Sequence, residues 1–323
     1  MRISTFLALA LTALAAGVGP AEAGYPERPI SIIVPLPPGG PADTVARVIG
    51  QKLQERLGQP VTIDNKPGAL GLIGAEVGAR ARPDGYTVVM VSSGLAIQIA
   101  TQPKTVHFDF RKDLAPLTYA VKVPMVVAAG PATPFRTMEE LVAQGKSKPG
   151  SLSIGVSPGL GGTAHLTLER MRIGLGFDVV PVPYKGSAPM MGDMLGNQIA
   201  AGVGSVPDFI ENHKGGRIRV VAVLGTQRQA ALPDVPTFAE LGLAGFEDLP
   251  YYGIFAPAGT PKAVTDRFGE ALAKVLAMTD VRNRLSAMGL AVGYMPQAQL
   301  ASREQAYTKT WAAIIKASGF QPQ

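Results

Sequence analysis

Residues 30–43 read ISIIVPLPPGGPAD, an apolar stretch followed by prolines, a glycine pair and the beginning of a helix-like segment. The apolar stretch Ile30–Val34 predicts a buried strand. After the loop, apolar residues recur at helical spacing from Val45 to Leu57, and Gly58 closes the pattern. The sequence therefore predicts a strand, a glycine loop and a helix in direct succession.

The loop between this strand and helix predicts an anion site. The first turn of a helix has N–H groups without partners and carries partial positive charge, so negative ligands bind there. Proline has no N–H, which limits the usable donors to the amides of Gly39, Gly40, Ala42 and Asp43. The Asp43 side chain has two possible roles, contact with a ligand or stabilisation of the helix dipole.

The same pattern recurs along the chain. Strands are predicted at 61–64 and 86–91, and Ser92-Ser93-Gly94 opens the helix after the second of them. A second series begins near Pro124, in which strand 151–156 leads through a glycine loop to a helix at Thr163. Such alternation predicts mostly parallel sheets flanked by helices. The 323 residues suggest two domains, and ligands of such sheets bind at the carboxyl ends of strands.

The N-terminus has the order of an export signal. A positive residue, an apolar run from Thr5 to Val18 and the small-residue segment Ala21-Glu22-Ala23 predict a signal peptide over 1–23, cleaved near Ala23. The apolar run is shorter than the ~20 residues of a membrane-spanning helix, and no later segment is long and apolar enough. The mature protein is therefore expected in the periplasm and not across a membrane.

Composition excludes several classes of protein. The chain has no cysteine, which rules out disulfides and thiolate chemistry. Its formal net charge of +6 mildly favours anionic partners, but the basic residues are scattered and aromatics are sparse, so no nucleic-acid partner is expected. His107, His165 and His213 form no helical metal-binding pair, and we expect neither metal nor cofactor.

One motif suggests an exported α/β hydrolase as an alternative. Gly155-Val156-Ser157-Pro158-Gly159 matches a nucleophile elbow, and Asp208 and His213 follow in the appropriate chain order. However, Pro158 lacks the N–H that the oxyanion hole requires, and Asp208 and His213 lie only five residues apart. Ser157 as a residue that lines or caps a glycine loop is therefore favoured, and catalysis is not expected.

The mature chain resembles the extracytoplasmic solute receptors of tripartite tricarboxylate transporters, often called Bug receptors. The resemblance covers essentially the whole mature chain and rests on ordered motifs: Tyr25-Pro26-x-Arg28-Pro29-Ile30, Pro38-Gly39-Gly40-x-x-Asp43, Asn65-Lys66-Pro67-Gly68, Pro83-Asp84-Gly85-Tyr86-Thr87, Val182-Pro183-Tyr184-Lys185-Gly186, Leu195-Gly196-x-Gln198, Leu232-Pro233-Asp234-Val235-Pro236 and Ala256-Pro257-Ala258-Gly259-Thr260-Pro261.

This resemblance implies a type II periplasmic binding protein with two lobes and a cleft between them. We expect lobe one to comprise residues 24–123 plus 225–323 and lobe two residues 124–224, with crossover strands near 120–126 and 220–226. The implied function is capture of a small carboxylated solute and its delivery to membrane transporter subunits. A monomer is expected, and a receptor that serves signalling instead of transport stays open as an alternative.

The expected ligand-binding residues come from loops of both lobes, and the resemblance implies that backbone amides at the first loop hold a ligand carboxylate. No arginine lies in these loops, so amides, hydroxyls and helix dipoles must meet the anion. The predicted set is Leu36, Pro38, Gly39, Gly40, Ala42, Asp43, Ser92, Ser93, Ser157, Gly159, Gly161, Gly162, Thr163, Tyr184, Gly204 and Ser205.

Two departures from the family pattern affect the pocket. Many members carry an aspartate where this chain has Ala200, which makes amino-acid or strongly polar ligands less assured. Leu36 and Pro37 also stand where residues of other sizes often occur, and they would reshape the pocket near the carboxylate.

Overall fold

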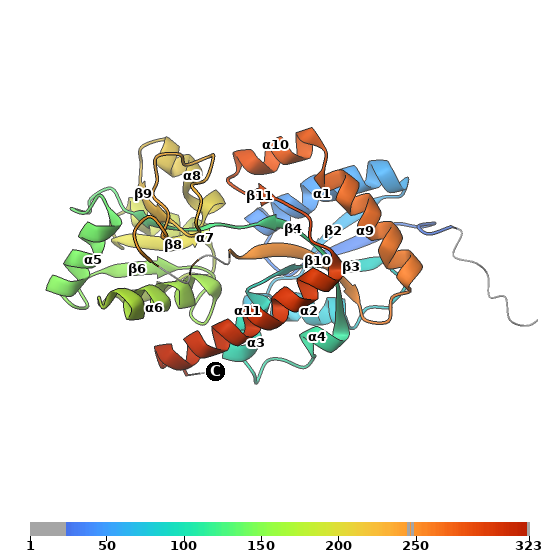
Figure 1. Cartoon of the computed structure of the whole chain (residues 1–323), viewed down its shortest axis with the longest axis horizontal. Coiled ribbons are helices and arrows are strands. Elements are labelled where there is room, and N and C mark those ends of the chain that lie inside the picture. Colours follow the sequence, from blue (N-terminus) through green and yellow to red (C-terminus); the bar gives the residue numbers. More distant parts are fainter. Residues whose placement is uncertain (1–23, 244–245, 247–248, 322–323) are drawn as a thin grey trace, which may run out of the picture.

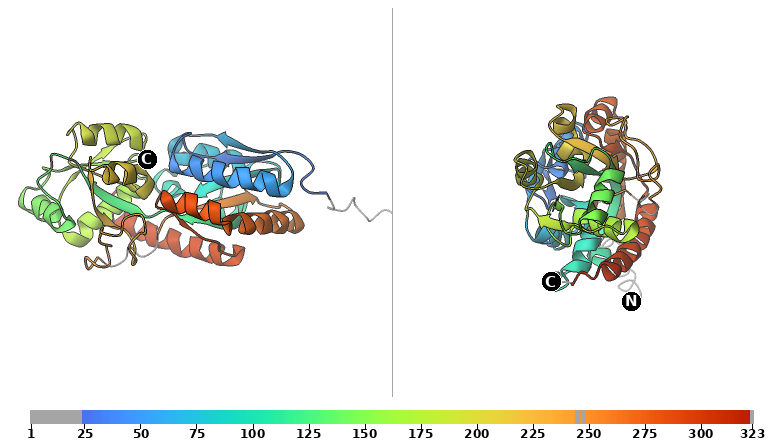
Figure 2. Two further views of the ribbon diagram at one scale, coloured as in Figure 1. Left: turned by 90° about the horizontal axis from the view of Figure 1, so that it is seen from above. Right: turned by 90° about the vertical axis from the view of Figure 1, so that its left-hand side faces the viewer.

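The computed structural model describes residues 24–243, 246 and 249–321, so the predicted signal peptide lies outside the described residues. Two sheets, each covered by helices on both faces, follow one another along the long axis of the molecule (Figures 1 and 2). We call the part built on the six-stranded sheet the first lobe and the part built on the five-stranded sheet the second lobe. This architecture agrees with the predicted α/β fold of a periplasmic binding protein.

The first-lobe sheet has the strand order β11-β4-β10-β3-β1-β2. Strands β1, β2 and β3 are parallel to one another, whereas β10 lies antiparallel between β3 and β4. The bounds are β1 Ile30–Val34, β2 Val61–Asn65, β3 Thr87–Ser92, β4 Leu114–Lys122, β10 Tyr251–Pro257 and β11 Ala291–Val292.

The second-lobe sheet has the order β7-β6-β8-β5-β9, in which β6 pairs in parallel with β7 and β8, and β5 pairs antiparallel with β8 and β9. The bounds are β5 Met125–Ala129, β6 Ser153–Val156, β7 Val180–Pro183, β8 Ala201–Ser205 and β9 Arg219–Val223. Both sheets are therefore mixed, and the parallel pairing predicted from the alternation is confined to β1–β3 and β6–β8. The strands next to the crossovers are antiparallel to their neighbours.

Side chains alternate between two cores on the strands that are buried on both faces. In β1, Ile30, Ile32 and Val34 belong to one core and Ile33 to the other. In the second lobe, Val127 of β5 packs on one face of the sheet and its neighbours Val126 and Ala128 pack on the other. Such double burial explains why these strands read as continuous apolar runs.

Helices cover both faces of each sheet. In α1, Val45, Ile49 and Leu53 pack on the first-lobe core, and the helix ends at Gly58, as predicted; Gly58 has the left-handed conformation. The first-lobe helices are α1 Pro41–Leu57, the 3-10 turn Ala69–Gly71, α2 Leu72–Ala79, α3 Leu95–Thr101, α4 Phe110–Asp113, α9 Lys262–Leu276, α10 Thr279–Ala287 and α11 Gln297–Ser318. Those of the second lobe are α5 Met138–Ser147, α6 Thr163–Leu175, α7 Ser187–Leu195 and α8 Val206–Lys214.

The chain crosses between the lobes from β4 to β5 and again from β9 to β10. The Val123 amide donates to the Pro250 carbonyl at 2.7 Å, so the two crossovers lie next to each other. Between β9 and β10, Phe238 and Phe246 pack into the second-lobe core. The boundaries at 123/124 and 224/225 stay a prediction, and this packing favours a second boundary near Pro250.

The last helix, α11, contacts both lobes. It packs against α3 of the first lobe and α6 of the second (Figure 1). Tyr307 and Trp311 of α11 form one buried apolar cluster with Ile97 of α3 and Leu166 of α6. Beside it, the Thr101 hydroxyl of α3 donates to the Gly161 carbonyl of the second lobe at 3.1 Å. Side chains at the end of the chain thus join the two lobes.

Candidate functional site

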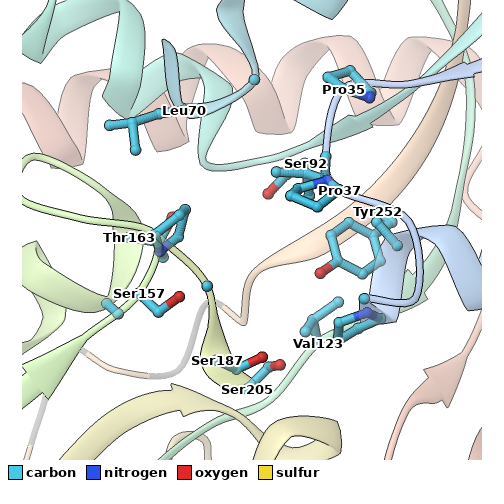
Figure 3. A pocket seen from close by; sticks show the side chains of 18 of the residues that line it. Pro35, Pro37, Leu70, Ser92, Val123, Ser157, Thr163, Ser187, Ser205 and Tyr252 are labelled. Carbon is cyan, nitrogen blue, oxygen red and sulfur yellow. The ribbon is translucent and has the colours of Figure 1, made fainter. Parts of the chain in front are cut away.

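A cavity of about 380 Å³ lies between the lobes, next to the two crossovers. Its wall is formed by the ends of β1 and β3 in the first lobe and by the ends of β6 and β8 and the start of α7 in the second (Figure 3). Val123 of the first crossover and Tyr252 of β10 close one side. The cavity therefore occupies the place at the carboxyl ends of strands where α/β sheets bind ligands.

Nine residues of the predicted set line this cavity. They come from four of the predicted loops, and Ser92, Ser157, Thr163 and Ser205 are labelled in Figure 3. The nine residues are Leu36, Pro38, Gly39, Gly40, Ala42, Ser92, Ser157, Thr163 and Ser205. Their contact with a ligand stays a prediction. The other seven, which do not line it, are Asp43, Ser93, Gly159, Gly161, Gly162, Tyr184 and Gly204.

In the first-lobe loop, the Asp43 side chain already has partners. Asp43 is buried, and its Oδ2 accepts from the Gly39 amide and from Nε of Arg47, both at 2.9 Å. Burial opposes ionisation, but the hydrogen bonds from Arg47 and Gly39 outweigh it and hold the pKa of Asp43 below its usual range. The Gly39 amide is therefore used within the loop. Among the described residues, the amides of Gly40 and Ala42 have no acceptor.

The two serines after β3 point to different places. The Ser92 hydroxyl oxygen lies on the cavity wall and accepts from the Gly94 amide at 3.2 Å. Ser93 is buried inside the first lobe, where its hydroxyl accepts from the Tyr251 amide at 3.1 Å. Because successive side chains of an extended chain point to opposite sides, only one of the pair reaches the cavity.

The glycines of the second-lobe loop do not line the cavity, and Gly161 instead joins the two lobes. The Gly161 amide donates to Nδ1 of His165 at 3.1 Å, and its carbonyl accepts from Thr101 of the first lobe. In the same lobe, the hydroxyl of Tyr184 donates to Asp193 at 2.7 Å, away from the cavity. A side chain at Gly204 would meet the ring of Phe209, so that position faces the core.

The sequence interpretation missed one turn of the wall. Lys185, Gly186, Ser187 and the two residues after it line the cavity at the start of α7. This segment is a third strand, glycine loop and helix in succession, which is the signal that identified the other two loops. The neighbouring Tyr184 was predicted in its place. Gln98 and Tyr252 were also missed.

Asp208 is a further wall residue that the prediction used only as a triad partner. It lies in the first turn of α8, and its Oδ2 accepts from the Ser205 amide at 3.0 Å and from the Ser205 hydroxyl at 2.5 Å. Loss of hydration raises the pKa of the Asp208 carboxyl, although hydrogen bonds from Ser205 and Ser187 counteract part of this rise. Tyr252 faces the same region, and burial together with the Asp208 charge raises the pKa of its hydroxyl.

The partners of a hydrolase triad do not assemble around Ser157. Asp208 is bonded to Ser205, and Nδ1 of His213 accepts from the Val220 amide at 3.2 Å. Among the described residues, no group of three or more His, Cys, Asp or Glu side chains is placed to hold a metal ion. None of the described helices is long and apolar enough to cross a membrane.

Comparison with known proteins gives consistent matches along the chain. The model of the tripartite tricarboxylate transporter family receptor matches residues 45–320. Protein BugT of Bordetella pertussis strain Tohama I is 33% identical over 297 residues, which are 91% of this chain and 90% of that protein.

Solved structures agree over the same extent. The periplasmic binding protein BugD has 32% identity and a TM-score of 0.84, and the match covers 93% of this chain and 100% of that chain. MatC from Rhodopseudomonas palustris with bound malate has 28% identity and a TM-score of 0.81, covering 90% of this chain and 100% of that one.

Proposed function

This chain belongs to the tripartite tricarboxylate transporter receptor family, and we propose that it binds a small carboxylate between its lobes. As a member it is a periplasmic solute receptor. In this proposal the first lobe holds the carboxylate, and the filled receptor delivers the solute to the membrane subunits of a transporter.

The observation that carries this proposal is the pair of amides at the start of α1. Gly40 and Ala42 line the cavity, and their N–H groups have no acceptor among the described residues. The helix dipole adds partial positive charge at the same point. Because Arg47 compensates the charge of Asp43, the loop itself carries no uncompensated negative charge. Together these features favour an anion at this end of the cavity.

The bound malate of MatC supports the same ligand class, because that protein matches this chain over nearly its full length. We further propose that the receptor is a monomer in the periplasm, with the signal peptide cleaved near Ala23. Ser157, Thr163 and Ser205 are proposed to contact the solute from the second lobe, and no catalytic role is assigned to Ser157.

A matched pair of variants at Gly40 tests the role of the amide. Gly40 has φ −78°, which proline can adopt, so Gly40→Pro deletes the N–H at little conformational cost. Gly40→Ala retains the N–H, and its added Cβ would lie 3.6 Å from the Pro37 carbonyl oxygen, an ordinary contact. Loss of a hydrogen bond to a charged group costs about 2 kcal/mol, roughly thirtyfold in Kd.

We expect this loss of carboxylate binding in Gly40→Pro and less than about threefold in Gly40→Ala, measured by isothermal titration calorimetry. A thermal-shift panel of malate, adipate and ω-hydroxy acids first selects the probe. Unchanged binding by the proline variant, or equal binding of a carboxylate and its uncharged amide analogue, would contradict the proposal.

A further inference from the structure

We propose that the second lobe selects a solute whose far end is a hydrogen-bond donor, a hydroxyl or ammonium group, instead of a second carboxylate. This inference rests on the proposed function, in which the first lobe holds the one carboxylate. It assigns Asp208, Ser205 and Ser187 as the residues that determine the chemistry of the far end.

The hydrogen bonds around Asp208 set the direction of the neighbouring hydroxyls. The Ser205 hydroxyl donates its proton to Oδ2 of Asp208, and the Ser187 hydroxyl also stabilises the charged form of this carboxylate. A hydroxyl has one proton to donate. With the Ser205 proton directed at Asp208, the Ser205 oxygen is left as a hydrogen-bond acceptor on the cavity wall, where the hydroxyl of Ser187 lies beside it (Figure 3).

The charge of the second-lobe wall also favours a hydrogen-bond donor over a second carboxylate. Among the described residues, no lysine, arginine or histidine forms an ion pair with Asp208. The other titratable groups on the cavity wall are Tyr251 and Tyr252 of β10, which are buried, and Lys185, which is exposed. Lys185 is exposed and solvent screens its charge, whereas Asp208 is half-buried on the cavity wall, so the negative charge acts more strongly on a bound solute.

The two ends of the cavity are therefore complementary to different groups. The first lobe offers unpaired amides at the start of α1 to an anion. The second lobe offers the Ser205 oxygen and a carboxylate, which are hydrogen-bond acceptors. A second carboxylate placed there would meet acceptors and a like charge, and both are unfavourable. A terminal hydroxyl or ammonium donates to the same groups.

Three probes of one chain length test this selection on the wild-type protein. They are 6-hydroxyhexanoate, 6-aminohexanoate and adipate, measured by titration calorimetry at pH 7.5. We expect at least tenfold tighter binding of the hydroxy or the amino acid than of adipate. The four-carbon series of 4-hydroxybutyrate, 4-aminobutyrate and succinate repeats the comparison for a shorter solute.

Asp208→Asn removes the negative charge and replaces one acceptor oxygen by an NH2 donor, while the remaining amide oxygen can still accept from Ser205. We expect the ratio of the adipate Kd to the 6-hydroxyhexanoate Kd to fall at least tenfold in this variant. Asp193→Asn is the matched control, because Asp193 also accepts from a hydroxyl in the second lobe but lies outside the cavity wall. We expect its ratio to match the wild type.

The outcomes separate this inference from the proposed function. Adipate binding as tightly as the two donor-ended acids in the wild type overturns the inference and leaves the proposed function intact. A wild-type preference that persists in a folded Asp208→Asn also overturns it. If no carboxylate of either series binds, the proposed function fails and the inference with it. The wild-type ratio decides the matter even where the variant does not fold.

Discussion

The helices α1 and α8 begin alike and yet differ in charge. Each has an aspartate as its third residue, Asp43 and Asp208, and each carboxylate accepts from an amide just before the helix. Four residues later, α1 carries Arg47, which pairs with Asp43, whereas α8 carries Asn212. The same local motif therefore gives a neutral helix start in the first lobe and a negatively charged one in the second.

This comparison shows that a helix start is not an anion site by default. An aspartate in the first turn competes with the ligand for the amides, and its charge opposes an anionic solute unless a cation compensates it. The residue one turn later decides which case applies. A solute with two different ends is therefore expected to bind in one orientation between a helix start that is neutral and one that is negatively charged.

The largest expected effect comes from Arg47→Asn, which gives α1 the residue of α8. It leaves the Asp43 carboxylate, whose side chain is 4% exposed, without its cation. We expect the free energy of unfolding to fall, because the buried Asp43 carboxylate loses its cation, although solvent screening at the exposed Arg47 limits the loss. Carboxylate binding should also weaken.

Urea denaturation and calorimetry measure the two effects of Arg47→Asn. Arg56→Asn serves as control, because Arg56 is an exposed residue in the last turn of the same helix. A loss of stability no larger than in this control would show that the Asp43 charge needs no compensation.

The converse change, Asn212→Arg, places a cation one turn after Asp208. At the dielectric constant of water, about 80, an added charge about 4 Å away contributes roughly 1 kcal/mol, or about fivefold in Kd. We expect adipate to bind about fivefold more tightly, with Asn212→Met as the uncharged control. Equal adipate affinity in the two variants would argue against an electrostatic origin of the selection.

The smallest expected effect is a difference in how stability depends on pH. The folded-state pKa of Asp208 is raised, so the folded state binds this proton more tightly than the unfolded state. Its protonation stabilises the wild type as the pH falls from the raised pKa towards about 3.9. Asp208→Asn should lack this gain, which urea denaturation at several pH values measures.

Asp43 should behave in the opposite way, because its folded-state pKa is lowered. Its contribution is present above the unfolded-state pKa of about 3.9 and is lost as the pH falls through the folded value. The advantage of the wild type over Asp43→Asn should therefore shrink only in strong acid. Parallel pH profiles for the two variants would contradict the comparison of α1 with α8.

Local pattern predicted most of the fold, because buried strands and amphipathic helices leave a periodic trace in the sequence. Most of strand β4 was missed, since the crossover strand predicted near 120–126 overlaps only its end. Pro116 interrupts the pattern, and the pairing with β10 is irregular at that point. The strand is completed by partners from residues 251–257, a contact that the local sequence does not contain.

The site was predicted to the level of loops but not of side chains. Ser92 and Ser93 are chemically identical, and only the direction of each side chain separates the wall residue from the buried one. Gly161 was expected to face a ligand, but it faces Thr101, which lies 60 residues earlier in the chain. Tyr184 was predicted as a wall residue, but Ser187, three residues later, lines the cavity. Such differences arise because packing between distant segments decides which residues of a loop face the cavity.

The position of β10 has a consequence for the order in which the chain can fold. All five strands of the second-lobe sheet come from one uninterrupted stretch, Met125 to Val223. The first-lobe sheet needs β10, from residues 251–257, between β3 and β4 before it is continuous. The middle of the chain can thus complete the second-lobe sheet before β10 has been added to the first-lobe sheet. The lobe that contains the N-terminal strands is therefore the last to be completed.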